Sequence, residues 1–354
     1  MALSLLTVGT VNHAAGIRVV LETFAEHHPG AELFTCLVDG GALRGGDLRL
    51  PGVVFLPEDL RLPGGRRFLF KFDAFELCTA LKAFAAVHVL ERYDVEQLVY
   101  LDSDIMVVAS LADSLATGWR AGNILCTPHF VEWPEDSAEH LRQVRQCGTY
   151  NTGFFAVDRS FAATRFLSWW GAMCSEMGIH EPASGRFVDQ IWLDLVVAER
   201  HGFVSLLDPG LNVAYWNMAE RLLAKEGSQW LVNRQHLRFF HFSGFDPKRL
   251  TVRREVTPTE AHLAIAREYL DRLRAAGLEK LRDIPYGFGT YSDNAPILTA
   301  HRRAIFRNEP SLVGVVDPFS ARDDLSRATG QVTRKRRILE RIRNRAVRAW
   351  RGEP

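Results

Sequence analysis

The sequence lacks any hydrophobic run that approaches the ~20 uninterrupted apolar residues a membrane-spanning helix needs. Cysteine is scarce: the five cysteines are scattered and form no CxxC pair, which is typical of reduced thiols rather than a disulfide framework. The opening MALSLLTVGTVN has no basic n-region, and its apolar run is short for a signal peptide. We therefore expect a cytoplasmic protein, and we exclude the integral-membrane and disulfide-rich classes.

Motifs that define several other enzyme classes are also missing. The chain has no GxxxxGK[ST] phosphate loop, no HExxH, no GxSxG and no Cys/His cluster. The stretch GFGTYS at residues 287–292 lacks the third glycine of a dinucleotide fingerprint and follows no predicted strand. No nucleic-acid-binding motif accompanies the basic C-terminal segment, so we expect no nucleic-acid partner.

What is present is an ordinary globular composition over 354 residues, 47% of them apolar, which is enough to bury a sizeable core. Short apolar segments alternate with helical patterns, which predicts an α/β fold with a Rossmann-like, mixed but mostly parallel sheet flanked by helices. The expected strands are residues 3–8, 32–38, 53–56, 98–108, 123–128, 152–157, 203–207 and 237–242. The expected helices are residues 14–28, 72–92, 159–177, 185–202 and 257–277, the last one capped by Thr257.

The strand patterns stop after about residue 256, which suggests a boundary. We expect a catalytic domain over residues 1–255, a C-terminal helical extension over 256–325 and a tail over 326–354.

The tail is strongly basic. Residues 334–351 contain nine Lys or Arg and one acid, a net charge of +8, which leaves −7 for the rest of a chain whose total is +1. A narrow apolar stripe opposite arginines predicts an amphipathic helix that binds an anionic membrane surface, or alternatively packs on the acidic body. The stripe consists of Ile338, Ile342, Ala346, Ala349 and Trp350.

The sharpest motif is Asp102-Ser103-Asp104, which directly follows the buried segment LVYL. Carboxylates at the C-terminal edge of a parallel sheet lie where α/β proteins bind ligands, and Mg²⁺ and Mn²⁺ take oxygen ligands. The alternative is a phosphohydrolase of the haloacid-dehalogenase type with Asp102 as nucleophile. Ile105 and Met106 disfavour it, because that signature usually continues with Gly or Ser and then Thr.

The motif belongs to seven blocks that follow one another over about residues 7–247. In this order they resemble retaining nucleotide-sugar glycosyltransferases of the glycogenin-like and lipopolysaccharide-galactosyltransferase-like group, family 8 and its bacterial relatives. The resemblance implies a GT-A fold, with a nucleotide half over about residues 1–110 and an acceptor half over about 111–255. The blocks are TVNHAAGIRVVLETFAEHHPGAEL, FELCTALKAF, LVYLDSDIMVV, YNTGFFAV, FVDQIWLD, LNVAYWN and FFHFSGFDP.

The resemblance implies a metal-bound donor. Asp102 and Asp104, with His241 of the HFSG motif, would hold Mn²⁺ or Mg²⁺ against the diphosphate of a nucleotide sugar, with UDP as the expected nucleotide. A cation there stabilises the negative charge that develops on the departing nucleoside diphosphate. On the residues alone, His241 among phenylalanines is also compatible with a core histidine.

Other residues would surround the donor phosphates. Gly244 would let backbone amides approach a phosphate, since it has no Cβ. The family's lysine falls on Pro247 here, so Lys248 or Arg249 just after it would reach the diphosphate, or alternatively both are solvated surface charges. Lys82, in the predicted helix 72–92, matches a basic residue that contacts the donor phosphate in relatives, or alternatively is a solvated helix lysine.

The donor sugar would contact a further set of residues. The resemblance places Asn151 and Gly153 along it, gives Asp189 to a sugar hydroxyl and puts Gln190 beneath the anomeric carbon. For Asp189 the alternative is a capping acid in the first turn of a helix. Relatives bind the nucleoside with the loop after the first strand, which implies roles for Thr10, Asn12, His13 and, within the DxD motif, Ser103.

These residues together predict a metal-dependent hexosyltransferase that moves a sugar from a nucleotide-sugar donor to a saccharide or lipid-linked glycan acceptor, with retention of configuration. A non-catalytic sugar-binding scaffold with the same fold is a further alternative. The retained metal acids, His241 and the Asp189-Gln190 pair disfavour it.

Overall fold

The computed structural model describes residues 3–42, 48–133, 138–196, 202–247, 250 and 258–330. The chain forms two compact units, one of residues 1–61 with 76–286 and the other of residues 62–75 with 287–354. Helices α7 and α8, which fall within the predicted extension, belong to the first unit together with the central sheet.

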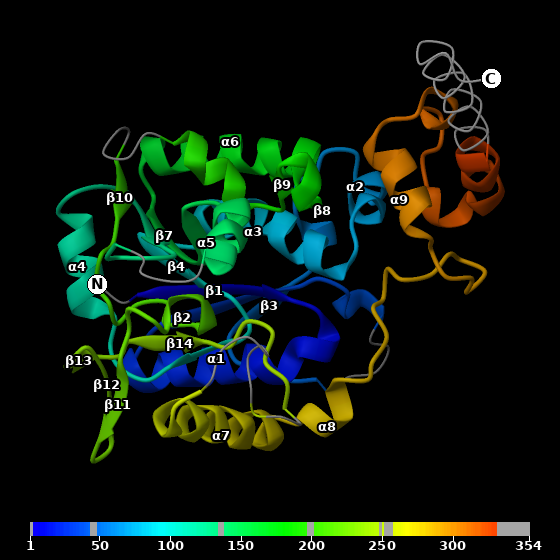
Figure 1. The fold of residues 1–354 in the computed structure, drawn as a ribbon. Coiled ribbons are helices and arrows are strands. Elements are labelled where there is room, and N and C mark those ends of the chain that lie inside the picture. Colours follow the sequence, from blue (N-terminus) through cyan, green and yellow to red (C-terminus); the bar gives the residue numbers. More distant parts are fainter. Residues whose placement is uncertain are drawn as a thin grey trace, which may run out of the picture. The chain divides into compact units, whose positions relative to one another are not determined.

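A seven-stranded sheet with the order β10-β6-β7-β4-β1-β2-β3 forms the centre of the first unit (Figure 1). Neighbouring strands are parallel, except that β7 runs antiparallel to both β4 and β6. The expected mixed, mostly parallel α/β sheet is therefore confirmed. Its strands are β1 Ser4–Gly9, β2 Glu32–Leu37, β3 Val53–Phe55, β4 Gln97–Leu101, β6 Ile124–Pro128, β7 Tyr150–Asp158 and β10 Phe203–Ser205.

Helices cover both faces of this sheet (Figure 1). Both faces are therefore apolar, as the side chains of β7 illustrate. Successive side chains of a strand point to opposite faces. Phe154 accordingly stacks on Phe239 of β14, whereas Phe155 meets Trp170 of α6 edge to face. The helices of this unit are α1 Ala14–His27, α3 Ala74–Arg92 (which begins in the other unit), α4 Ala112–Trp119, α5 Ala138–Cys147, α6 Phe161–Met177, α7 Glu260–Ala275 and α8 Leu278–Leu281.

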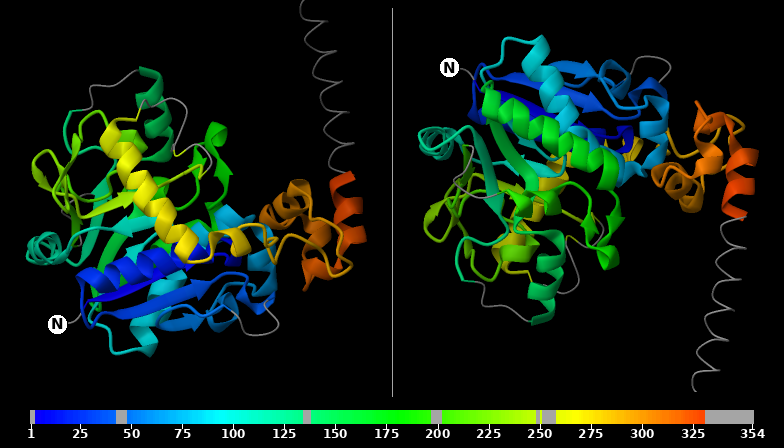
Figure 2. Two further views of the ribbon diagram at one scale, coloured as in Figure 1. Left: turned by 90° about the horizontal axis from the view of Figure 1, so that it is seen from below. Right: turned by 90° about the horizontal axis from the view of Figure 1, so that it is seen from above.

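A second, two-stranded sheet of β5 (Ile105–Val107) and β14 (Phe239–His241) lies next to α1. Helix α7 packs against α1 and against this small sheet, which buries Met106, Phe240 and Tyr269 in one cluster. The view from below shows α7 in yellow beside α1 in blue (Figure 2). Since β5 follows β4 after three residues, this pairing brings residue 241 to the end of β4.

Several elements differ from the sequence prediction. The predicted strand 98–108 is two strands, because the chain turns at Asp102-Ser103-Asp104 between β4 and β5. The predicted helix 185–202 is wrong over its described part: β9 covers Arg186–Phe187 and a 3₁₀ helix covers Gln190–Leu195. The cap of α7 is Thr259, whose hydroxyl accepts from the backbone N–H of His262, while Thr257 lies outside the described residues.

The hydrophobic pattern of the sequence also failed to predict several short strands and helices. Strands of two to four residues and short helices bury too few apolar side chains to leave a clear pattern. Those in the first unit, besides α4, α5 and α8, are β8 His180–Glu181, β11 Leu223–Glu226, β12 Gln229–Val232 and β13 Gln235–His236.

The second unit is helical and has an aromatic core. Its helices are α2 (Arg66–Lys71) and α9 (Thr299–Phe306), and residues 322–330 are also helical. Arg302 is buried and donates to the backbone carbonyls of Phe70 (3.0 Å), Phe72 (2.7 Å) and Phe288 (2.6 Å). The rings packed in this unit are Phe68, Phe70, Phe72, Phe288, Tyr291, Phe306 and Phe319.

Among the described residues, no helix combines the length and the apolar character needed to cross a membrane. The five cysteines are all free, as expected. The predicted basic segment 334–351 lies outside the described residues.

Candidate functional site

The turn between β4 and β5 carries the two acids of the DxD motif. The backbone N–H of Asp102 donates to the carbonyl of Gly153 on β7 (2.9 Å), and the hydroxyl of Tyr100 donates to Asp102 Oδ1 (2.6 Å). A Cβ on Gly16 of α1 would lie 2.3 Å from the carbonyl oxygen of Ser103. The turn is therefore packed directly on α1, which explains the lone glycine within that helix.

Strand β14 brings His241 to the same turn. His241 pairs with Ile105 in the β5·β14 ladder, and the N–H of Phe242 donates to the carbonyl of Asp104 (2.8 Å). As a result, His241 Nε2 lies 3.1 Å from Asp104 Oδ1 and 4.0 Å from Asp102 Oδ2. The structure thus joins His241 to two acids that lie about 140 residues earlier in the sequence.

The electrostatics of this group follow from its geometry. Burial acts to lower the pKa of His241, but the carboxylates of Asp104 and Asp102 outweigh it and hold that pKa above its ordinary value. Burial acts to raise the pKa of Asp104, and the nearby imidazole reverses this, so that the pKa lies below its usual range. The ionised form of Asp104 is therefore favoured beside the imidazole.

The donor set fits a divalent cation. One oxygen or nitrogen from each of Asp102, Asp104 and His241 lies within 4.8 Å of the others. The side chain of His241 is 4% exposed, whereas those of Asp102 and Asp104 are 27% and 36% exposed, so the group opens to solvent on its acidic side. Two carboxylates and one imidazole match the ligand preferences of Mn²⁺ and, for the oxygens, Mg²⁺.

Gly153 makes room for the histidine ring. A Cβ at this position would lie 2.3 Å from Cε1 and 2.7 Å from Nδ1 of His241. Real Cβ contacts of that length do not occur, so any other residue would displace the imidazole. The sequence interpretation placed Gly153 against the donor sugar; its described neighbour is His241.

Lys82 of α3 links the two acidic parts of the site. Its ammonium lies 3.1 Å from Asp102 Oδ1 and 3.2 Å from Asp189 Oδ2, and it donates to the carbonyl of Thr152 (3.0 Å). The side chain is 3% exposed, so the alternative of a solvated lysine is wrong. Burial acts to lower the pKa of Lys82, but the two carboxylates raise it above its ordinary value, which keeps the ammonium charged.

Asp189 does not cap a helix. It is the residue before the 3₁₀ helix, yet its side chain makes no capping hydrogen bond. Its carboxylate instead accepts from the hydroxyl of Thr152 (2.7 Å) besides pairing with Lys82, and its carbonyl accepts from the indole N–H of Trp170 (2.9 Å). Val188, just before it, has φ 41°, a conformation that is strained for a β-branched residue.

Gln190 and Asn151 are neighbours in the same buried region. The Asn151 amide N–H donates to Gln190 Oε1 (3.4 Å), and the Gln190 amide N–H donates to the carbonyl of Cys147 (2.9 Å). Asp189, Gln190 and Asn151 are each less than 9% exposed. The structure therefore gathers these three predicted residues around the Lys82 and DxD groups.

The loop after β1 holds three of the remaining predicted residues. The Thr10 hydroxyl donates to Asn12 Oδ1 and lies 3.0 Å from His13 Nδ1. His13 is exposed and close enough to Asp104 to help lower the pKa of that acid. Gly244 forms an exposed turn after β14 with φ 70°, a conformation that favours glycine, and Lys248 lies outside the described residues.

Sequence reasoning missed the side chains that hold this site together. Hydrogen bonds to the predicted residues come from Asn212, Thr152, Tyr100 and Trp170. The available signal was weak: Asn212 is a polar residue between the apolar Leu211 and Val213. Buried asparagines are uncommon unless their hydrogen bonds are satisfied.

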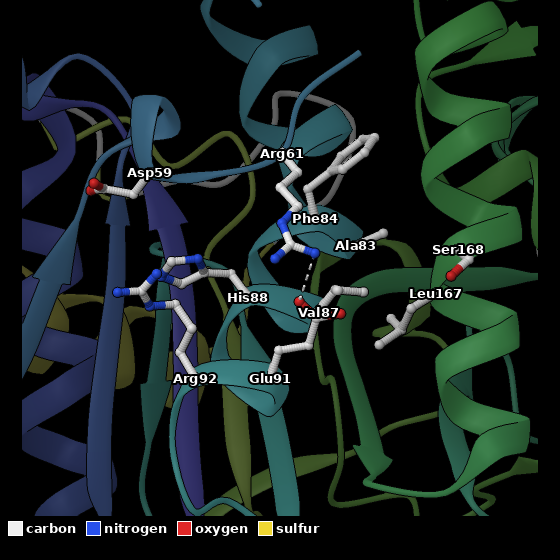
Figure 3. A pocket seen from close by; sticks show the side chains of 10 residues that line it. All are labelled: Asp59, Arg61, Ala83, Phe84, Val87, His88, Glu91, Arg92, Leu167 and Ser168. Atoms are coloured by element: carbon white, nitrogen blue, oxygen red, sulfur yellow. Dashed lines mark ion pairs between the residues drawn. The ribbon is translucent and has the colours of Figure 1, made fainter.

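A separate cavity of about 300 Å³ lies between α3 and α6 (Figure 3). Figure 3 shows Arg61 directed at Glu91, 3.8 Å away, while Arg92 lies beside His88. None of the residues that line it belongs to the DxD site.

Comparisons with known proteins give the following similarities. No protein-family model matches the chain. The uncharacterized protein YfnF of Bacillus subtilis is 27% identical over 176 residues, 49% of this chain and 58% of YfnF. The uncharacterized protein YfnD of Bacillus subtilis is 24% identical over 192 residues, 53% of this chain and 58% of YfnD. The matches therefore span less than two thirds of the length of these curated relatives.

Solved glycosyltransferase structures are also similar. The galactosyltransferase LgtC in complex with donor and acceptor sugar analogs has a TM-score of 0.44 and 14% identity over 80% of this chain and 97% of LgtC. A glycosyltransferase involved in the glycosylation of the major capsid of PBCV-1 has a TM-score of 0.41 and 11% identity over 78% of this chain and 100% of that one.

Proposed function

We propose that the protein is a metal-dependent glycosyltransferase that moves a sugar from a nucleotide-sugar donor, a UDP-sugar, to a saccharide or lipid-linked glycan acceptor. The observation that supports this best is the connected group at the end of β4. One ligand atom from each of Asp102, Asp104 and His241 lies within 4.8 Å of the others, and Lys82 joins Asp102 to Asp189 at 3.1 and 3.2 Å. A divalent metal and a sugar-binding acid would then share one site.

Asp102, Asp104 and His241 would hold Mn²⁺ or Mg²⁺. When bound, the cation supplies positive charge that stabilises a departing nucleoside diphosphate. In this proposal Lys82 positions the carboxylates of Asp102 and Asp189, because its ammonium already bonds to both and to the carbonyl of Thr152. Contact of Lys82 with a donor phosphate stays a prediction from the family resemblance.

Asp189 and Gln190 would act at the donor sugar, Asp189 on a hydroxyl and Gln190 beneath the anomeric carbon. Asn151 is hydrogen-bonded to Gln190 and would contact the sugar from the same side. Gln190 is a weak nucleophile, so we propose a front-face substitution with retention, in which the departing phosphate helps to deprotonate the acceptor. Thr10, Asn12, His13 and Ser103 would contact the nucleoside, and Gly244 and Lys248 the phosphates.

Nucleotide release tests the proposal. We expect the full chain to release UDP from a UDP-sugar in the presence of Mn²⁺ and to be inactive with EDTA. Asp104→Asn should lower that rate by at least about 100-fold, because it removes a charged ligand from the site, while thermal unfolding stays close to that of the unsubstituted chain. Normal turnover by Asp104→Asn would show that the metal assignment is wrong.

A phosphomonoester assay in parallel distinguishes the glycosyltransferase proposal from the haloacid-dehalogenase alternative. Phosphate release that requires Asp102, without UDP release from any nucleotide sugar, would replace the glycosyltransferase proposal. Proton NMR of an early product decides retention against inversion.

We also propose that the protein is cytoplasmic and peripheral on the inner face of the cell membrane, held by residues 334–351. Each cation near an anionic surface contributes on the order of 1 kcal/mol, so nine of them could hold the chain reversibly. The full chain should co-sediment with phosphatidylserine vesicles at low salt, and a chain ending at Thr333 should not. Equal sedimentation of the two chains would contradict the membrane role of the tail.

A further inference from the structure

Asn212 lies buried between the proposed metal ligands and the residues proposed to contact the donor sugar. Its side chain is 1% exposed, and its φ of 54° is a left-handed conformation that asparagine tolerates better than most residues. The amide N–H₂ donates to Thr127 Oγ1 (2.9 Å) and to Asn151 Oδ1 (3.1 Å), and Oδ1 lies 3.0 Å from Nδ1 of His241. One side chain thus contacts both halves of the candidate site.

The direction of each of these hydrogen bonds follows from one backbone group. The N–H of Gly153 can only donate, and it donates to Asn151 Oδ1 (3.0 Å), which identifies that atom as the amide oxygen. Asn212 must therefore present its N–H₂ to Asn151, and its Oδ1 is left facing His241. Because Oδ1 only accepts, Nδ1 of His241 must carry the proton.

The tautomer decides which nitrogen of His241 is available as a ligand. With the proton fixed on Nδ1, Nε2 is the nitrogen that faces the acids. It lies 3.1 Å from Asp104 Oδ1 and 4.0 Å from Asp102 Oδ2. Nε2 facing two carboxylates must carry a proton or share a cation with them, and a bound divalent cation takes the place of that proton. The ring itself has little room to turn, because Gly153 lies against it and the Trp216 ring stands edge-on at 5.2 Å.

We propose that Asn212 is the positioning residue of the site: it fixes the Nδ1–H tautomer of His241 for metal binding through Nε2, and it ties that ligand to Gln190 through Asn151. The inference rests on the proposed metal-dependent function. Asn212 is itself held in place, since Asn217 donates to its carbonyl (3.1 Å) and the N–H of His241 donates to the carbonyl of Val213 (2.8 Å).

Metal titration of the full chain tests this role. Asn212→Gly removes the acceptor without straining the backbone, and we expect Mn²⁺ to bind about 10- to 100-fold more weakly by calorimetry. Asn212→Asp keeps an acceptor for the Nδ1 proton and should lose less than about 10-fold. Asn294→Gly is the matched control, because Asn294 has a similar φ of 65° and is exposed in the second unit. It should bind Mn²⁺ like the unsubstituted chain.

The outcomes separate this inference from the proposed function. If the unsubstituted chain binds Mn²⁺ and Asn212→Gly binds it equally well, Asn212 has no positioning role, although the metal site stands. If the unsubstituted chain binds no Mn²⁺, both proposals fail.

A second measurement does not depend on any Asn212 variant folding. With ¹⁵N-labelled histidine and saturating Mg²⁺, the His241 resonances, assigned by their loss in His241→Gln, should show a protonated Nδ1. An unprotonated Nδ1 would overturn the inference.

Discussion

Both compact units bury cations, and Lys82 of the first unit and Arg302 of the second have different hydrogen-bond partners. In the first unit, Lys82 contacts two ionisable carboxylates, Asp102 and Asp189, and one of these is 27% exposed. In the second unit, Arg302 donates to three backbone carbonyls, which do not titrate. Both side chains are 5% exposed or less.

The comparison shows that a buried charge does not by itself mark a functional site. Arg302 uses its donors to hold the backbone of α2 to the loop before α9, which is a structural role. Lys82 instead keeps charged acids together at a place that opens to solvent, where a ligand can compete for them. The difference lies in the partners, and the partners are known only from the fold.

The largest expected effect comes from Lys82→Met, which leaves Asp189 buried without its cation. We expect the free energy of unfolding to fall by about 3–5 kcal/mol near pH 8, because an unpaired buried carboxylate is costly. Burial then raises the pKa of Asp189 in the folded state, so the folded chain binds more protons than the unfolded chain. The deficit should therefore shrink as the pH is lowered to about 5.

Urea unfolding at the two pH values measures this effect, and Lys82→Met combined with Asp189→Asn is the control. The double variant should recover much of the lost stability and show a smaller pH dependence. A single variant as stable as the unsubstituted chain would mean that the Lys82–Asp189 pair contributes nothing to the fold.

A smaller effect is expected from Gly153→Ala, which tests the fit of the histidine ring instead of its charge. The new Cβ would lie 2.3 Å from Cε1 of His241 and must displace the ring. We expect Mn²⁺ affinity to fall about 10- to 100-fold. Gly314→Ala, where nothing lies within 4 Å of the new Cβ, should leave Mn²⁺ affinity unchanged. Equal affinity in the two variants would show that the ring is not fixed by β7.

The smallest effect is expected from Arg302→Met in the second unit. The lost hydrogen bonds should lower the free energy of unfolding by about 1–2 kcal/mol. The loss should be the same at about pH 7 and pH 9, because burial raises the pKa of the nearby Tyr291 to about 12 and lowers the pKa of His301. A loss that differs between these two pH values would show that Arg302, like Lys82, depends on a group that titrates.

Much of the fold could be predicted from the sequence. The predicted segments match β1, α1, β2, α3, α6 and α7 within a few residues, because these elements have strongly apolar patterns. The segment 185–202 failed because IWLDLVV has a helical spacing of apolar residues, whereas its described part is held by contacts to β7 and α6. Side-chain contacts of that kind leave no periodic signal.

The sequence by itself determined the class of fold and which acids end the β4 strand, because hydrophobic periodicity and the order of residues along one strand are local properties. It could also nominate His241 and Asp189 through motif order. Only the tertiary structure decided that Lys82 bridges Asp102 and Asp189, that Gly153 accommodates the His241 ring and that Asn212 Oδ1 lies 3.0 Å from Nδ1 of that ring. Those facts depend on distances between residues that lie tens to more than a hundred positions apart, which are fixed when β14 pairs with β5 and β7 inserts between β4 and β6.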